Sequence, residues 1–305
     1  MNRVPTEDCP PDSSTQPAPL IQEQILEEPE AEDWGDYVDS DEEPDVEFAC
    51  EDINLYPRGF CYPISMVQLL KALKALHEAG IVHSDLNTAN IMYTLRPLNS
   101  SIAEKYKQIG RPRKMKLWTE QWKDGELVLP MKPNEELIGD SIVLGDFGLA
   151  HKAGSPAQKM QSPATYCAPE RVHNINPSYG SDMWSYVCIF FELYTGTYLF
   201  QGWGHASVMS SIVCTLGPLP ESWRGTYHVG GSGDDTWYDQ NGQLDPEFDL
   251  KERLSQLRPD VGARELELVV SVLRRGLVYQ HEERITAAEL LEHESFKELM
   301  SIYIW

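Results

Sequence analysis

The sequence predicts an α+β fold that is mainly α-helical, preceded by a disordered acidic segment. Most of the chain after residue 64 places apolar residues at helical spacing, whereas only short apolar runs indicate strands. Residues 1–52 hold 18 of the 48 acidic residues and one of the 25 basic residues, a net charge of −17 out of −23. We therefore expect one folded domain behind an acidic tail.

The acidic tail is expected over residues 1–50, which are rich in Pro, Glu, Asp and Ser and show no apolar period. Such a segment cannot bury enough apolar surface to offset the entropy lost on ordering. Residues 51–63 alternate aromatic residues with Pro and Gly, which predicts an extended leader. The folded domain is expected over 64–305.

The composition of the rest of the chain excludes several classes of protein. Residues 53–305 carry a net charge of only −6 and lack the clustered Lys and Arg of a nucleic-acid-binding surface. The six cysteines form no C-x-x-C pair, so neither a zinc site nor a disulfide framework is expected. No run of eighteen apolar residues predicts a membrane span. These features indicate a soluble intracellular protein that binds neither membranes nor nucleic acid directly.

The first helix is predicted to begin at a capping box formed by Ser65 and Gln68. Gly80 is its expected end. The apolar residues at helical spacing between these signals are Met66, Leu69, Leu70, Leu73 and Leu76. This stripe predicts a core-facing helix rather than a cofactor contact.

Two short strands are predicted next, separated by a long insert. Ile91–Tyr93 is the first strand signal, and residues 141–144 are the second, ended by Gly145. The insert, residues 94–140, is polar and is expected to be a long loop with at most one short helix and a hairpin near residues 126–129.

Several helices are predicted in the second half of the chain. Residues 182–195 are apolar almost all round, which predicts a buried central helix, and residues 205–216 predict another. Residues 217–247 are rich in Gly, Pro, Asp and Trp and predict an inserted loop. Residues 266–277 predict an amphipathic helix.

A second capping box, Thr286 with Glu289, predicts the start of a last helix before Phe296.

The stretch from His83 to Asn90 is the clearest functional signal. Asp85 is followed by Asn90 five positions later, at the entry to a strand. This spacing is how a catalytic loop presents a base and a metal ligand on one side of a nucleotide site. Further motifs follow along the chain in this order: Asp146-Phe147-Gly148, Ala168-Pro169-Glu170, Asp182-Met183-Trp184-Ser185 and the single residue Arg284.

Taken together and in this order, these motifs resemble those of the C-terminal lobe of a eukaryotic protein kinase. Three further features resemble fungal relatives of the SR-protein kinases. These are the leader Glu51–Pro63, the long spacer between Asn90 and Asp146, and the run Glu192–Phe200.

The resemblance implies transfer of the ATP γ-phosphate to a Ser or Thr hydroxyl of a protein, Arg/Ser-rich in this group. Asp85 would orient the substrate hydroxyl, and Asn90 and Asp146 would hold Mg²⁺. Asn87 stands where most of these kinases have a Lys that contacts the transferring phosphate. An amide supplies a hydrogen bond there without charge.

Other positions take structural roles by the same resemblance. Asp182 would brace the catalytic loop, and Glu170 and Arg284 would form a buried ion pair. The remaining structural positions are His83, Phe147 and Gly148. A cytoplasmic or nuclear location is likewise implied by the group.

The chain also departs from the family pattern. Ser84 replaces the usual Arg of the catalytic loop, so phosphorylation of the activation loop is not expected to be the switch. Pro163 stands where the family's T-x-x-Y has Thr, and Cys167 stands where the group often has Arg. Both departures affect the predicted positioning of a substrate.

The largest departure is that no N-terminal lobe can be found. Neither of two Gly-rich stretches has the G-x-G-x-x-G pattern after a strand, and the upstream lysines Lys71 and Lys74 lie on a predicted helix. One interpretation is a shortened kinase of SR-protein-kinase type. The other is a catalytically silent kinase-like binding module; a non-functional remnant is a third. The uncovered lobe face would favour self-association.

Overall fold

The computed structural model describes residues 62–98, 101–111, 114–116, 126–128, 135–156, 163–229, 235–239 and 246–303. The predicted acidic tail, and the leader up to residue 61, lie outside the described residues. The chain divides into two compact units. In one of them, the described part is Arg111 and the hairpin of β3 (Lys114–Lys116) and β4 (Glu126–Val128).

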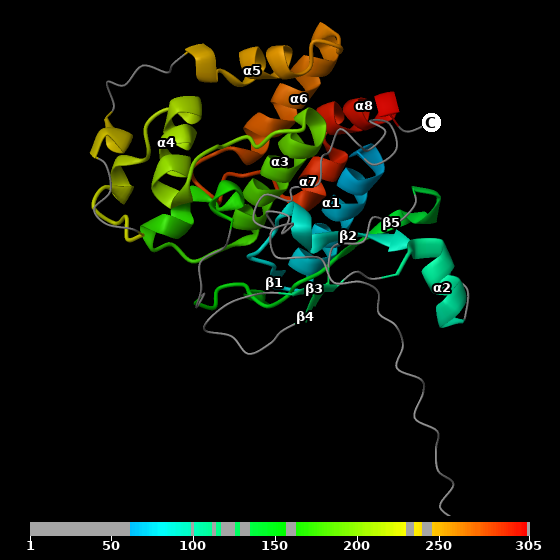
Figure 1. Ribbon diagram of the computed structural model, residues 1–305. Coiled ribbons are helices and arrows are strands. Elements are labelled where there is room, and N and C mark those ends of the chain that lie inside the picture. Colours follow the sequence, from blue (N-terminus) through cyan, green and yellow to red (C-terminus); the bar gives the residue numbers. More distant parts are fainter. Residues whose placement is uncertain are drawn as a thin grey trace, which may run out of the picture. The chain divides into compact units, whose positions relative to one another are not determined.

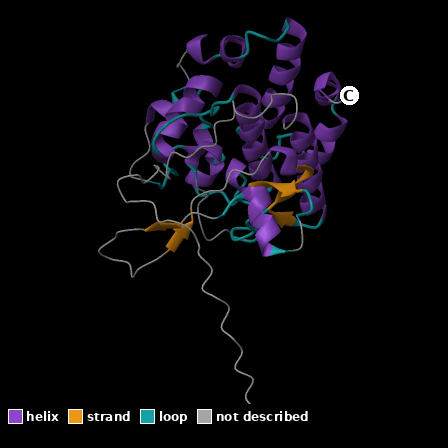
Figure 2. Cartoon of the chain, turned by 45° about the vertical axis from the view of Figure 1, so that its right-hand side comes forward, coloured by secondary structure: helices purple, strands orange, loops and turns teal. Residues whose placement is uncertain are grey.

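The other unit is built mainly of helices, as the sequence predicts (Figures 1 and 2). Its helices are α1 (Tyr62–Glu78), α2 (Ile102–Ile109), α3 (Tyr179–Thr195), α4 (Gly204–Leu216), α5 (Leu250–Leu257), α6 (Ala263–Gly276), α7 (Ala287–Glu292) and α8 (Glu294–Tyr303). Its strands are β1 (Ile81–Val82), β2 (Ile91–Leu95), β5 (Ile138–Leu144) and β6 (His151–Lys152). None of the described helices is long and apolar enough to span a membrane.

Helix α3 forms the centre of this unit. Its residues from Ser181 to Glu192 are all buried, as expected for a segment that is apolar almost all round. Gly196 ends the helix with a left-handed φ of 79°. Helix α6 packs against α3 so closely that a Cβ at Gly276 would lie 2.5 Å from Val187 Cγ1.

Helix α1 exists as predicted, but its predicted capping box is wrong. The helix begins at Tyr62, so Ser65 lies within its first turns, and the Ser65 hydroxyl bonds the Tyr93 hydroxyl (2.6 Å). The Gln68 side chain instead reaches β5, donating to Asp140 O and accepting from Ile142 N, each at 2.8 Å. Gln68 therefore joins a helix to a strand more than 70 residues away.

Two small antiparallel sheets hold the loops that matter for function. Strand β2 pairs with β5, with Ile91 opposite Leu144, and β1 pairs with β6. Because β1 and β2 flank residues 83–90, and β5 and β6 flank residues 145–150, the pairing sets these two loops side by side. The predicted strands, the short insert helix α2 and the hairpin of the insert are confirmed.

The last third of the chain differs in detail from the expectation. Helix α5 was not predicted; Asp249 caps it by accepting from the amides of Lys251 and Glu252. The Thr286–Glu289 capping box is confirmed, but its helix α7 ends before His293, and Phe296 belongs to α8. In the predicted loop 217–247, the described parts include a three-residue and a four-residue 3₁₀ turn that bury large aromatic side chains, Trp223, Trp237 and Tyr238.

Candidate active site

The loop from His83 to Asn90 is fixed in place by a carboxylate on α3. Asp182 is 1% exposed and accepts hydrogen bonds from the backbone amides of His83 (2.8 Å) and Ser84 (2.9 Å). Ser84 has a left-handed φ of 65°, which is costly for a residue with a side chain. The two bonds hold the loop in this conformation and present Asp85 beyond it.

Asp85 and Asn90 face each other within the loop. Asn90 Nδ2 donates to the Asp85 backbone oxygen (2.8 Å) and to Asp85 Oδ2 (3.2 Å). The second carboxylate oxygen, Oδ1, is buried and has no hydrogen-bond partner among the described residues. Burial raises the pKa of Asp85, and the negative charge of Asp146 raises it further. The described residues thus leave one buried acceptor oxygen of the loop without a hydrogen bond.

Asn87 is turned inward rather than outward. Its side chain is buried; Oδ1 accepts from the Asn90 amide (3.1 Å), and Nδ2 donates to the Asp85 backbone oxygen (3.2 Å). The amide therefore caps the 3₁₀ turn Thr88–Asn90 and shapes the loop. A contact of Asn87 with a transferring phosphate stays a prediction.

The Asp146-Phe147-Gly148 loop lies against the first loop. The Gly145 amide donates to Asn90 O (2.8 Å), and His83 Nε2 lies 3.0 Å from Gly145 O. Phe147 packs its ring edge-on to the His83 ring, 5.0 Å between centroids. Asp146 has a left-handed φ of 54°, and its Oδ1 accepts from the Gly148 amide (3.1 Å). The structure thus brings Asp85, Asn90 and Asp146 to one place.

The oxygen atoms at this place suit a hard cation. The Asn90 side chain forms hydrogen bonds only through Nδ2, so its Oδ1 has none among the described residues. One Asp146 carboxylate oxygen is likewise without a hydrogen bond among these residues. Within the described ranges no group of three or more His, Cys, Asp or Glu residues could hold a metal ion. Two oxygen ligands fit Mg²⁺ when a substrate such as a nucleotide phosphate supplies others.

Glu170 and Arg284 form an ion pair with both side chains at 0% exposure. Arg284 donates from both terminal nitrogens to the two Glu170 oxygens, at 2.8 and 2.7 Å, and stacks over the Trp184 ring. Burial alone would raise the pKa of Glu170, but the Arg284 charge and hydrogen bonds from Arg284 and Ser181 hold it below its usual value. The pair joins the segment after residue 163 to the segment between α6 and α7.

Sequence reasoning missed side chains that support the loop. His77 Nε2 lies 3.0 Å from Asp182 Oδ2, and His151 Nδ1 lies 3.3 Å from the Ser84 hydroxyl. His77 and Asp182 are 105 positions apart, so no local spacing could have shown the contact. Ser84 therefore meets a histidine where the family pattern has an Arg.

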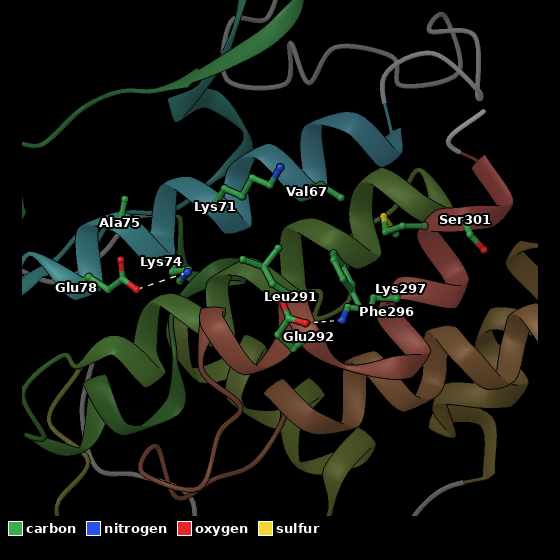
Figure 3. Close-up of a pocket in the computed structure, with 11 residues that line it drawn as sticks. Val67, Lys71, Lys74, Ala75, Glu78, Leu291, Glu292, Phe296, Lys297 and Ser301 are labelled. Carbon is green, nitrogen blue, oxygen red and sulfur yellow. Dashed lines mark hydrogen bonds and ion pairs between the residues drawn. The ribbon is translucent and has the colours of Figure 1, made fainter.

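A groove of about 750 Å³ lies elsewhere, between α1 and the helices α7 and α8 (Figure 3). Apolar side chains such as Val67 and Leu291 line it, together with Lys71, Lys74 and Lys297. None of the site residues predicted from the sequence contributes to it. The groove is therefore separate from the candidate active site.

Comparison with protein families gives a match to the protein kinase domain over residues 63–296. The chain belongs to the protein kinase domain family. The match begins at α1 and covers every predicted site residue. It confirms the predicted enzyme class, serine/threonine protein kinase, at the level of the family.

Curated relatives are kinases of moderate similarity. The chain is 27% identical to dual specificity protein kinase lkh1 of Schizosaccharomyces pombe, over 77% of this chain and 31% of that protein. It is 27% identical to human dual specificity protein kinase CLK2, over 78% and 44% respectively. It is 27% identical to rat cyclin-dependent kinase 11B, over 76% and 42%. The chain thus spans less than half the length of each of these relatives.

Proposed function

We propose that this chain is a serine/threonine protein kinase of SR-protein-kinase type, which transfers the ATP γ-phosphate to protein Ser or Thr residues. The observation that carries the proposal is the Asp85–Asn90 loop. In this loop one carboxylate oxygen of Asp85 is buried and has no hydrogen-bond partner among the described residues. Asn90 and the adjacent Asp146 each keep one side-chain oxygen without a hydrogen bond among the same residues. The left-handed φ values of Ser84, just before the loop, and of Asp146 strain the backbone. Strain of this kind persists where surrounding bonds enforce it, and it gathers at active sites.

The residues take the following parts in the proposed reaction. The Asp85 carboxylate accepts a hydrogen bond from the substrate hydroxyl and orients it in line with the phosphate. Asn90 and Asp146 would hold Mg²⁺, which when bound would supply positive charge to the transferring phosphate. Asn87 and Asp182 keep the loop in shape, and the Glu170–Arg284 pair anchors the segment that would receive the substrate.

The substrate class rests on resemblance. One relative is a CLK-type kinase and the sequence resembles the SR-protein kinases, so we propose Arg/Ser-rich proteins as substrates, in the cytoplasm or nucleus. The direct test incubates the chain with labelled ATP, Mg²⁺ and an Arg-Ser repeat peptide. Label on peptide Ser that falls by about 10²–10⁴-fold in Asp85→Asn supports the proposal. No label from the folded chain contradicts it.

A second candidate function is a silent kinase-like binding module. It is favoured by one sequence feature and one structural feature: the sequence contains no G-x-G-x-x-G pattern, and Lys71 and Lys74 lie on α1 rather than on a strand. In the phosphoryl-transfer template those groups contact the phosphates. We propose on this ground that the chain lacks most of an N-terminal lobe.

The module makes its own prediction. It should bind the Arg-Ser peptide with unchanged affinity in Asp85→Asn and Asp146→Ala, with and without ATP. Peptide affinity that depends on Mg²⁺ and ATP, and is lost in Asp146→Ala, excludes the silent module.

A further inference from the structure

A line of three oxygen atoms connects the catalytic loop to the buried side of α3. The Tyr166 hydroxyl lies 3.0 Å from Thr88 Oγ1 and donates to Glu192 Oε2 at 2.5 Å. Thr88 belongs to the turn between Asp85 and Asn90, Tyr166 to the segment before Glu170, and Glu192 to α3. Three segments distant in the sequence therefore meet at one hydroxyl group.

The line is shielded from water at its inner end. Tyr166 is 3% exposed and Glu192 is 5% exposed, whereas Thr88 is partly exposed. Ser185 holds the Tyr166 backbone by donating to its carbonyl oxygen (2.8 Å). No ion pair of Glu192 occurs among the described residues, where Tyr166 and Cys188 are titratable groups that interact with it. The carboxyl group thus depends on Tyr166 for its hydrogen bond.

The number of hydrogens on the three groups determines which atom donates in the Thr88–Tyr166 and Tyr166–Glu192 hydrogen bonds. Each hydroxyl carries one hydrogen, and an ionised carboxylate carries none. When Glu192 is ionised, the Tyr166 hydrogen must point to Glu192, so Thr88 donates to the Tyr166 oxygen. When Glu192 is protonated, it can donate to Tyr166, and Tyr166 to Thr88. Thr88 is the group through which either arrangement reaches the loop.

We propose that Thr88 is a positioning residue, whose hydroxyl, through Tyr166, ties the loop carrying Asp85 and Asn90 to the buried carboxyl group of Glu192. The name catalytic loop rests on the proposed function, but the tie itself does not. A hydroxyl at residue 88 is required, because a methyl group in its place leaves the buried Tyr166 oxygen with one partner fewer.

The test compares Thr88→Val, which removes the hydroxyl at nearly constant volume, with Thr88→Ser, which keeps it. Hydrogen exchange is measured at the Asn90 amide, which bonds Asn87 within the same turn. Exchange about fivefold faster in Thr88→Val, the ratio expected for one net hydrogen bond, and unchanged in Thr88→Ser supports the proposal. Equal exchange in the wild type and Thr88→Val overturns it, as does equal acceleration in both variants.

A second readout is the pKa of Glu192, followed by carbon NMR of labelled Glu. Loss of the Thr88 donor weakens Tyr166 as a donor, so the pKa should rise in Thr88→Val and not in Thr88→Ser. A pKa that is the same in all three proteins overturns the proposal.

If Thr88→Val does not fold, Tyr166→Phe removes the central hydroxyl and must accelerate Asn90 exchange. Neither measurement uses ATP or substrate, so a chain that fails as a kinase still gives a clear answer.

Discussion

Of the side-chain contacts described, the ion pair of Glu170 and Arg284 should cost the most stability when one partner is removed. Both side chains are fully buried and share two hydrogen bonds. Arg284→Met leaves a buried carboxylate without its cation, which we expect to lower the free energy of unfolding by about 3–5 kcal/mol. Urea denaturation followed by circular dichroism measures the loss. Glu170→Gln with Arg284→Met should recover part of it, and a double variant no more stable than Arg284→Met contradicts the argument.

Glu192 gives a pH-dependent prediction. Burial raises its pKa to about 7 from the ordinary value of 4.5, against the opposing effect of the Tyr166 hydrogen bond. A raised carboxyl pKa stabilises the fold at low pH, and that contribution is lost as pH rises from about 4.5 to 7. Relative to the wild type, Glu192→Gln should therefore gain about 3 kcal/mol of stability over this range. Urea unfolding at several pH values measures the difference in stability between the variant and the wild type. A difference that does not change with pH contradicts the raised pKa of Glu192.

Among single residues, the sequence indicated candidate site residues that belong to motifs, and it missed the supporting residues that only contacts in the fold define. Asp85, Asn90 and Asp146 are found by spacing within short segments, and the structure brings them together. Thr88 and His77 carry no such signal, because their partners lie 78 and 105 residues away. The inward turn of Asn87 also depends on the folded loop rather than on its neighbours in sequence.

The close contact between helices α3 and α6 leads to a prediction about the packing of these two elements. Gly276 faces Val187 with no room for a side chain, the nearest methyl carbon being 2.5 Å from an added Cβ. Gly276→Ala should therefore cost about 1–3 kcal/mol through overpacking, although Ala favours a helix. Thermal unfolding checks this.

The matched control for Gly276→Ala is Gly276→Ala combined with Val187→Ala, which opens space at the same contact. The change Gly276→Ala should cost less stability in the Val187→Ala background than in the wild type. An equal cost in both backgrounds would show that steric contact is not the cause.

The elements themselves were predicted where their own residues determine them. The apolar surface of α3 and the capping box of α7 are local signals, and both helices were found. Helix α5 was missed because it is eight residues long and buries only Leu250 and Leu254. The start of α1 was misplaced because Gln68, which has the chemistry of a capping residue, is used for a tertiary contact with β5.

For the whole molecule, the exposed face of β2 and β5 predicts self-association. Met92 and Val143 are paired across the two strands and are 51% and 49% exposed. Phe147 is also 49% exposed. Neighbouring exposed apolar side chains such as Met92 and Val143 favour association.

Analytical ultracentrifugation should show an average mass that rises with protein concentration. Met92→Glu should reduce the rise, whereas Leu257→Glu on α5 should leave it unchanged. A mass that does not vary with concentration contradicts self-association.

The most direct test of the proposed kinase site is thermal unfolding with ATP, measured with and without Mg²⁺. The proposed function predicts that ATP at about a hundred times its dissociation constant raises the melting temperature by about 5–10 °C with Mg²⁺. The shift should disappear in Asp146→Ala. No shift at millimolar ATP with Mg²⁺, or a shift retained in Asp146→Ala, would contradict a nucleotide site built on Asn90 and Asp146.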